Sequence, residues 1–245
     1  MALTDKLKAI GNAIRSKTGK TGKLTLDEMV TEIEGISGGG ESKPNPGELY
    51  QRVTSITNDS DSYFITDVIA DDKTGAEIIA SYSAAQDRVA MGSSTSTSNT
   101  RFFLPYQLST SSVYLGFNTG TSLSIRTSVN TIYKSSLNFR NSRTSVFYKN
   151  SGEALVGTTL TQVLVQQTAP ISICRYNNGN SFGAVRIMTI YGVRISQGEE
   201  IIRDYVPCYR KSDGVIGLYD KCNNTFLENA GEGTFTVGNE IEWES

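Results

Sequence analysis

The apolar positions at the start of the chain follow the spacing of a helix. Four of them recur at intervals of four, three and four residues and form one stripe along a helical surface: Leu3, Leu7, Ile10 and Ile14. The stretch SKTGKTGKLT contains two glycines, which end this helix, and Thr25 with Glu28 has the spacing of a capping box that opens a second helix. The apolar face of the second helix comprises Leu26, Met29, Val30, Ile33 and Ile36. A short helical hairpin is therefore expected.

Residues 37–47 separate this hairpin from the rest of the chain. Their sequence, SGGGESKPNPG, holds four glycines and two prolines and predicts a linker that is flexible first and stiffer later. We expect a helical anchoring or oligomerisation module at 1–36, the linker at 37–47 and a main domain at 48–245. A helical unit of under about 40 residues rarely folds alone, so its apolar faces must meet a second copy, another protein or the main domain.

Beyond the linker, apolar and polar residues alternate with the period of a β-strand. Strands are expected within residues 112–118, 122–129, 145–149, 159–167, 171–176 and 185–196. Turn-forming stretches lie between strands, among them NNGN, SQGEE, KSDG and AGEG, and no helix-length apolar period occurs between residues 48 and 245. This pattern predicts a mostly β chain with an antiparallel β-sandwich of the jelly-roll type, and a barrel is the alternative.

Two of these segments carry detailed expectations. In 185–196, one face is predicted to carry Val185, Ile187, Tyr191, Val193 and Ile195, and the opposite face Arg186, Met188, Ile190 and Arg194. In RDYVPCYRKSDGVIGLYDKC, residues 203–222, two strands are expected to pair around a turn at Ser212, Asp213 and Gly214. Pro207 has no backbone N–H and therefore indicates a sheet edge.

Charge and composition narrow the function. The chain has 245 residues, a formal net charge of −2 and no basic block, so it has no electrostatic footprint for nucleic acid or an anionic membrane. Its first residues lack the continuous apolar core of a signal peptide, and no stretch approaches the roughly 20 apolar residues of a membrane span. Synthesis in a cytoplasm, without membrane insertion, is therefore expected.

The absence of histidine from the chain excludes several kinds of catalysis. It removes Ser-His and Cys-His nucleophiles, histidine-based zinc sites and the commonest general base at neutral pH. Hydrolysis by paired carboxylates is the remaining enzymatic alternative. We expect a protein that is not an enzyme.

Both ends of the chain resemble proteins of bacterial viruses. The opening LTDKLKAIGNAIRSKTGKTGKLTLDEMVTEIEGIS is similar to a helical module near the start of phage and prophage tail or appendage proteins. The closing MTIYGVRISQGEEIIRDYVPCYRKSDGVIGLYDKCNNTFLENAGEGTFTVG resembles the C-terminal signature of phage-associated concanavalin-like, or laminin-G-like, jelly-roll domains. It contains the R-D-Y-V-P-C core, the G-L-Y-D strand and a final N-A-G-E-G-T-F. Where that family often has an apolar position after the Asp, this chain has KCNNTF.

The resemblance implies a virion structural protein of a tail fibre, baseplate tip or head fibre, made in the cytoplasm of the host bacterium. Its sandwich would bind a host cell-surface glycan, and its N-terminal module would contact other virion proteins or form a homo-oligomer, with a trimer favoured. The assembly surface would comprise Leu3, Leu7, Ile10, Ile14, Leu26, Val30 and Ile33. A decoration or assembly protein without a ligand is the alternative, because a fold does not define a function.

Sugar binding combines aromatic faces with hydrogen-bonding side chains. The loop RYNNGNSF offers both, so the glycan site is expected at Arg175, Tyr176, Asn177, Asn178 and Asn180. No cofactor or metal is expected. Calcium is the alternative, through carboxylates that lack a complete calcium-loop motif: Asp59, Asp61, Asp71, Asp72 and Glu77.

Cys208 and Cys222 are expected to be buried or half-buried within strands, because no histidine is present to activate them. Cys208 and Cys222 flank the turn-bearing segment KSDG. A hairpin at that turn could bring the two sulfurs together, so a disulfide between them stays open.

Overall fold

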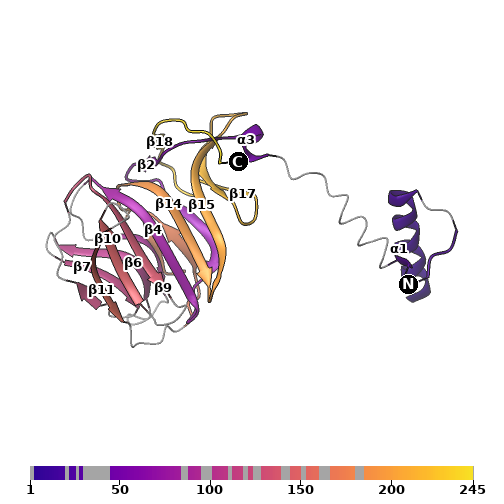
Figure 1. Ribbon diagram of the computed structural model, residues 1–245, viewed down its shortest axis with the longest axis horizontal. Coiled ribbons are helices and arrows are strands. Elements are labelled where there is room, and N and C mark those ends of the chain that lie inside the picture. Colours follow the sequence, from indigo (N-terminus) through magenta and orange to yellow (C-terminus); the bar gives the residue numbers. More distant parts are fainter. Residues whose placement is uncertain are drawn as a thin grey trace. The chain divides into compact units, whose positions relative to one another are not determined.

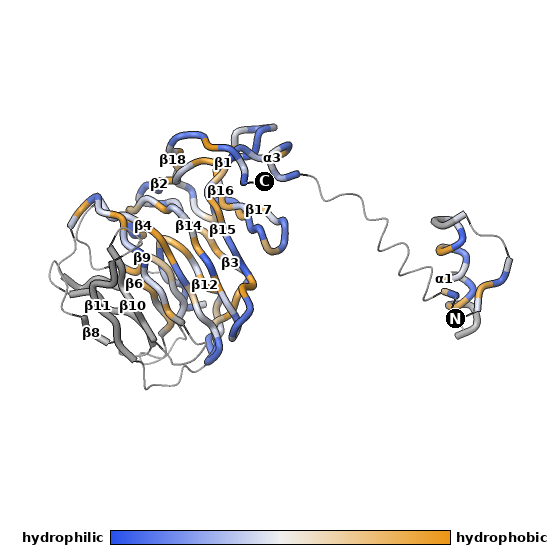
Figure 2. The backbone as a smooth tube through the Cα atoms, in the orientation of Figure 1, coloured by the Kyte–Doolittle hydropathy of each residue, from blue (hydrophilic) through white to orange (hydrophobic). Residues whose placement is uncertain are grey.

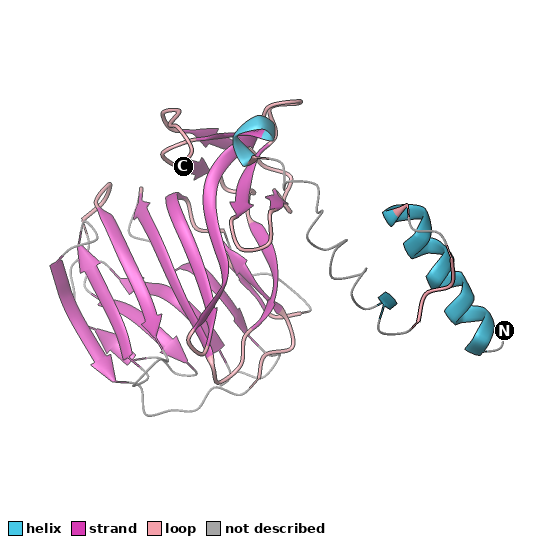
Figure 3. Cartoon of the chain, turned by 45° about the vertical axis from the view of Figure 1, so that its right-hand side comes forward, coloured by secondary structure: helices cyan, strands magenta, loops and turns pink. Residues whose placement is uncertain are grey.

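The computed structural model describes most of the chain. The described residues are 3–19, 22–25, 28–29, 45–83, 88–94, 101–109, 112–117, 121–123, 128–138, 144–149, 153–159, 166–179 and 185–244. The chain divides into two compact units, Met1–Asn45 and Pro46–Ser245, which are described separately. Strands make up most of the second unit, as Figure 3 shows.

The first unit contains the expected N-terminal helix. Helix α1 spans Leu3–Thr18, and Gly19 follows it with a φ of 71°, the left-handed conformation that commonly ends a helix. The capping box is also present: the backbone N–H of Thr25 donates to Glu28 Oε2 at 2.7 Å, and the N–H of Glu28 donates to Thr25 Oγ1 at 3.3 Å. Among the described residues, no helix is long and apolar enough to cross a bilayer.

The apolar stripe of α1 is divided between interior and surface. Ile14 is buried, Leu7 is half-buried and Ile10 is 47% exposed. The side chain of Leu3 and the whole of Leu26, Val30 and Ile33 lie outside the described residues. The described part of the predicted assembly surface therefore offers one exposed apolar side chain, Ile10, beside two that pack within their own unit.

The second unit begins with the short helix α3 (Pro46–Leu49) and then consists of two sheets (Figure 1). In the described part of the chain the larger sheet has eleven strands and runs in the order β11-β10-β9-β4-β14-β15-β16-β17; β1 pairs with β15, β2 with β14, and β18 with β2. Its strands are β1 (Tyr50–Arg52), β2 (Ile56–Asn58), β4 (Thr74–Tyr82), β9 (Ile132–Asn138), β10 (Thr144–Lys149), β11 (Glu153–Thr159), β14 (Met188–Gln197), β15 (Glu200–Arg210), β16 (Ile216–Asp220), β17 (Thr225–Glu228) and β18 (Phe235–Val237).

The smaller sheet has seven strands in the described part and runs in the order β3-β12-β5-β6-β7-β8, with β13 paired to β5. Its strands are β3 (Phe64–Ile69), β5 (Arg88–Ser94), β6 (Arg101–Ser109), β7 (Ser112–Phe117), β8 (Thr121–Leu123), β12 (Pro170–Ile173) and β13 (Tyr176–Asn177). Of the described pairings in the two sheets, only that of β13 with β5 is parallel. Residues 160–165 and 124–127, which belong to two expected strands, lie outside the described residues.

The hydrophobic core lies between the two sheets. Both sheets contribute fully buried side chains to it, among them Ile78, Ile190 and Ile195 from the larger sheet and Phe64, Met91 and Phe102 from the smaller one. Hydrophobic and hydrophilic residues alternate along strand β14 (Figure 2). The predicted fold class is therefore confirmed: a mostly β, antiparallel sandwich with a small helical part.

Strand β14 differs from the prediction in the phase of its alternation. Its buried residues are Met188, Ile190, Val193 and Ile195, which were expected on two opposite faces. Pairing with β4 shifts between Ile190 and Gly192, so a β-bulge adds one residue and brings both halves of the strand to the same face. The preceding residues 185–187 are not part of the strand.

The predicted sheet edge at Pro207 is wrong. Pro207 is buried inside the larger sheet, opposite Leu218 of β16. On its other side the partner strand changes, because pairing with β14 ends at Tyr205 and pairing with β1 begins at Cys208. The missing N–H falls at this change of partner, while the carbonyl of Pro207 accepts a hydrogen bond from Val53 N at 3.1 Å.

A small, mainly aromatic cluster lies where β1, β15, β16 and β17 of the larger sheet meet the C-terminal segment. It contains Tyr50, Val206, Cys208, Tyr219, Phe226 and Trp243. The Trp243 ring meets Tyr219 edge-on with centroids 5.2 Å apart, and its indole N–H donates to the Tyr50 carbonyl at 2.9 Å. The last residues of the chain are thus attached to the first strand of the sandwich.

Candidate functional site

A row of polar side chains crosses four strands of the larger sheet. Arg194 on β14 lies opposite Asp204 on β15 and Glu77 on β4, and Glu77 lies opposite Ser136 on β9. Directly opposed residues share a face of a sheet. The residues on either side of Arg194, Val193 and Ile195, are buried in the core, so this row lies on the face that points away from the core.

Ion pairs connect the three charged residues of the row. Arg194 Nε lies 3.1 Å from Asp204 Oδ1, and Arg194 NH1 lies 4.0 Å from Glu77 Oε1. Two lysines pair with the carboxylates: Lys134 Nζ is 3.5 Å from Glu77 Oε2, and Lys221 Nζ is 3.7 Å from Asp204 Oδ2. The hydrogen bond from its guanidinium to Asp204 raises the pKa of Arg194. The cation is therefore shared between two carboxylates on neighbouring strands.

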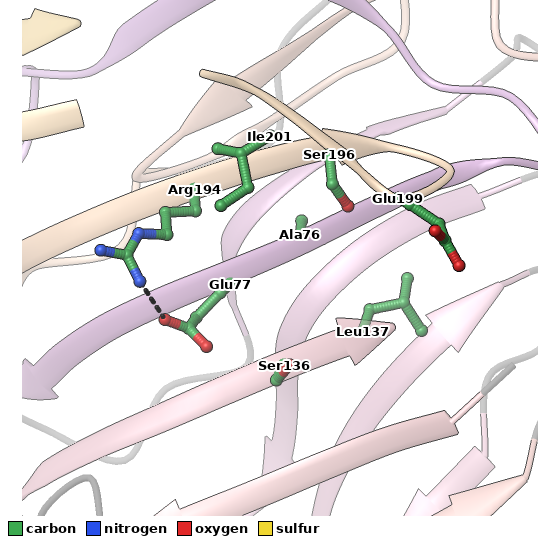
Figure 4. Close-up of a pocket in the computed structure, with 8 residues that line it drawn as sticks. All are labelled: Ala76, Glu77, Ser136, Leu137, Arg194, Ser196, Glu199 and Ile201. Carbon is green, nitrogen blue, oxygen red and sulfur yellow. Dashed lines mark ion pairs between the residues drawn. The ribbon is translucent and has the colours of Figure 1, made fainter. Parts of the chain in front are cut away.

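A concavity of about 210 Å³ lies beside this row (Figure 4). It is lined by Ala76, Glu77, Ser136, Leu137, Arg194, Ser196, Glu199 and Ile201. The residues Ser196, Glu199 and Ile201 come from the β14–β15 hairpin, whose turn contains Gly198 with a φ of 61°. Gly75 leaves room for the Ser196 side chain, because a Cβ at position 75 would collide with Ser196 Oγ. We refer to this concavity as the sheet-face pocket.

In the loop predicted to bind glycan, two of the predicted side chains, Arg175 and Asn177, already contact other residues of the protein. The guanidinium of Arg175 lies over the ring of Tyr63, 4.3 Å from its centroid, and Asn177 is buried with its Oδ1 accepting from Gly179 N at 2.9 Å. Tyr176 and Asn178 are half-buried, and Asn180 lies outside the described residues. Among the described residues of the loop, none lines the sheet-face pocket. The loop and the pocket are therefore two separate candidate binding sites.

A second polar group lies on the opposite side of β15 and is centred on a buried carboxylate. The Asp220 carboxylate is fully inaccessible and accepts hydrogen bonds from the backbone N–H of Asp204 at 3.0 Å, the N–H of Cys222 at 3.0 Å and Asn223 Nδ2 at 2.7 Å. Arg203 Nε lies 3.5 Å from Asp220 Oδ2 and also donates to Asp67 Oδ1 at 2.9 Å. We call Arg203, Asp67 and Asp220 the hairpin lock, because they connect β15, β16 and β3.

Two of the carboxylates considered for calcium, Asp59 and Asp71, are engaged by protein donors. Asp59 accepts hydrogen bonds from the Ser62 hydroxyl, from Thr234 N at 2.6 Å and from Asp61 N at 2.9 Å, and these hold its pKa well below the usual range. Asp71 accepts from Lys73 N at 2.9 Å and from Gln197 Nε2 at 2.7 Å. Within the described ranges, no three Asp, Glu or Cys residues gather in a group that could hold a metal ion.

Cys208 and Cys222 lie at different places along the β15–β16 hairpin. Cys208 is buried opposite Gly217, whereas Cys222 follows the end of β16, is exposed and has its Sγ 3.5 Å from the carbonyl oxygen of Ile201. All three cysteines are free. Burial raises the pKa of Cys208 to about 12 and also raises that of Cys174, so both thiols stay protonated at neutral pH. The prediction of a packed strand cysteine is confirmed for Cys208 and is wrong for Cys222.

The N-terminal unit has a concavity of its own, of about 490 Å³. It lies between α1 and the segment before Met29, and its lining is Leu7, Lys8, Gly11, Arg15, Lys23, Leu24, Thr25 and Met29. Gly11 permits close packing there, because a Cβ would lie 2.9 Å from Met29 Cε.

No protein-family model matches the chain, and no curated protein matches it. Two solved structures are similar in fold. One is a candidate carbohydrate-binding protein from Bacteroides ovatus, with a TM-score of 0.48 and 15% identity over 78% of this chain. The other is the LG4-5 domain pair of the mouse laminin α1 chain, with a TM-score of 0.41 and 8% identity over 67%. The match spans 62% of the first structure and 48% of the second.

Proposed function

We propose that the chain is a structural component of a bacteriophage particle whose sandwich binds a carbohydrate on the host cell surface. The resemblance of its two ends to phage appendage proteins supports the proposal that the chain belongs to a phage particle. The observation that carries the binding is the sheet-face pocket beside the row of Glu77, Arg194 and Asp204. Sugar hydroxyls both donate and accept hydrogen bonds, and carboxylates, guanidinium and serine hydroxyls supply the matching groups.

The arrangement of the charges favours binding over hydrolysis. A glycosidase needs one carboxylic acid that keeps its proton near neutral pH and a second carboxylate across the scissile bond. Here both Glu77 and Asp204 pair with the same guanidinium, that of Arg194, on one face of the sheet. Two carboxylates that share one cation offer oxygens that accept from sugar hydroxyls, so we propose a binding protein without turnover and without a cofactor.

The N-terminal unit would attach the protein to other virion proteins or to further copies of itself, with a trimer favoured. A single pocket of about 210 Å³ is smaller than the roughly 300 to 1,000 Å³ of sites for drug-sized ligands, so one copy is expected to bind weakly. Several tethered copies convert later binding steps into intramolecular ones and raise the avidity by about 10² to 10⁴. Multivalent display would therefore compensate for a small site.

A glycan array probed with the full-length chain, displayed multivalently, tests the proposal. We expect selective binding that falls by about tenfold or more in Arg194→Ala, since the guanidinium lines the pocket and lies between the two carboxylates of the row. Arg52→Ala is the matched control, because Arg52 pairs with Glu244 outside the pocket lining. If the multivalent protein binds no glycan on the array, the alternative of a decoration or assembly protein without a ligand is favoured. Mass spectrometry of purified phage particles tests the virion location separately.

A further inference from the structure

We infer that the sheet-face pocket takes an uncharged or ammonium-bearing sugar residue and rejects an acidic one. This inference rests on the proposed function and concerns the same site. It assigns a ligand class from three properties of the pocket: its charge balance, the accessibility of the Glu77 carboxylate to a ligand, and its size.

Counted over the described residues, the pocket has no surplus of positive charge to attract an anion. Among its lining residues, two carboxylates, Glu77 and Glu199, accompany one cation, Arg194. Ion pairs connect this set to Asp204 and Lys134 and, through Asp204, to Lys221. With these residues included, three carboxylates accompany three cations. Arg194 is also held at hydrogen-bond distance by Asp204, 3.1 Å away. An acidic sugar would meet a guanidinium that already has an anionic partner, and the Glu77 carboxylate would repel it.

Glu77 is the acceptor that a ligand can reach. Its oxygens lie 3.5 Å from Lys134 Nζ and 4.0 Å from Arg194 NH1, beyond the roughly 2.7 to 2.9 Å of a charge-assisted hydrogen bond. Its side chain is 24% exposed, at the wall of the pocket. A hydroxyl or an ammonium group can therefore donate to it at a shorter distance than either cation of the protein does. Ser136 and Ser196 add hydroxyls that donate or accept nearby.

The size and walls of the pocket suit one sugar residue. Ala76, Leu137 and Ile201 supply apolar lining against which the C–H face of a pyranose ring can lie. Gly75 adds no side chain beside Ser196. The selection would therefore act on a single residue of a longer glycan, and the charge of that residue would decide binding.

Matched glycans that differ only in charge test the inference. The multivalent full-length chain is applied to an array on which each binding glycan is present with a hydroxyl, an amino or a carboxyl group at the same position. We expect the hydroxyl and amino forms to bind at least about tenfold more tightly than the carboxyl form, since like charges in contact strongly disfavour a partner. In Glu77→Gln with Glu199→Gln the difference should shrink to within about threefold. Glu228→Gln, a carboxylate outside the pocket lining, should keep the wild-type ranking.

Cys222 allows the site to be located independently. It is the one exposed cysteine of three, and its Sγ lies 3.5 Å from the carbonyl of Ile201, which lines the pocket. An environment-sensitive fluorophore on Cys222 should change its emission when a binding glycan is added, and Arg194→Ala should abolish that change. Preference for the carboxyl form, or an unchanged ranking in the double variant, overturns the inference while leaving glycan binding intact. Absence of binding to any glycan overturns both.

Discussion

Two neighbouring residues of β15 belong to polar groups of opposite character. Arg203 points to the hairpin lock with Asp67 and Asp220, whereas Asp204 belongs to the row with Arg194 and Glu77 on the outer face. The lock includes a carboxylate with no accessible surface, and the row includes a guanidinium that is 52% exposed. Strand alternation alone separates the two groups by one residue.

Burial decides what each group contributes. An exposed ion pair stabilises a fold by only about 0.2 to 1 kcal/mol, because water competes for both charges. Removing one partner of a buried pair costs about 3 to 5 kcal/mol, because the remaining donors or charge lose both water and partner. The lock is therefore expected to hold the closing hairpin, and the row to remain available to a ligand at little cost in stability.

Replacing Asp220 should produce the largest effect. Asp220→Ala leaves two backbone N–H groups, the Asn223 amide and Arg203 without their shared acceptor. We expect a loss of about 3 to 5 kcal/mol in the free energy of unfolding, measured by urea denaturation. Asp213→Ala is the control, since Asp213 is an exposed turn carboxylate paired with Arg210. A loss below about 1 kcal/mol for Asp220→Ala would show that the lock does not stabilise the fold.

The two arginines give a smaller but more direct contrast. Arg203→Ala leaves the buried Asp220 carboxylate without its cation, and we expect a loss of about 2 to 3 kcal/mol in unfolding free energy. Arg194→Ala removes exposed pairs and should cost less than about 1 kcal/mol. Thermal and urea unfolding of the two variants side by side would measure the contrast. Equal losses would remove the distinction between the lock and the row.

The sequence predicted the architecture because period-two alternation depends only on local spacing. The capping box at Thr25 and Glu28 and the turn at Gly214 are equally local, and both are present. The bulge in β14 was not predicted, because it becomes apparent only when Ile190 and Gly192 are aligned with β4. The position of Pro207 inside the sheet likewise depends on two partner strands, β14 and β1, that are distant in sequence.

The candidate site was missed for the same reason. Glu77, Arg194 and Asp204 come from three strands, and only the sheet register brings them into one row. Arg194 was assigned to a face with Met188 and Ile190, which the bulge makes incorrect. Asp220 and Arg203 did stand within the quoted closing stretch, where a carboxylate and an arginine at the ends of two pairing strands were the available signal. The residues 175–180 remain a prediction as a glycan rim.

Acid should weaken the ion pair between Asp67 and Arg203 in the hairpin lock. The hydrogen bond from Arg203 lowers the pKa of Asp67 in the folded protein below its usual value of about 3.9. A lowered folded pKa means that the stabilisation is complete above about pH 4 and is lost as the pH falls through the folded pKa. Because Asp67 is largely exposed, the contribution is about 0.2 to 1 kcal/mol. Urea unfolding at pH 5 and pH 3 should show a smaller acid-induced loss in Asp67→Asn, and identical losses would contradict this.

Thiol labelling sharpens the comparison without changing stability. Cys208 lies in the buried part of the β15–β16 hairpin, whereas Cys222 lies beyond Asp220, on the side where Ile201 reaches the pocket. In native protein we expect a maleimide to modify one cysteine, Cys222, because burial keeps the other two thiols inaccessible and protonated. Mass spectrometry should find one adduct in native protein and three after denaturation. Prompt labelling of Cys208 in native protein would mean that the hairpin opens, and Asp220→Ala should produce that opening if the lock is what keeps it closed.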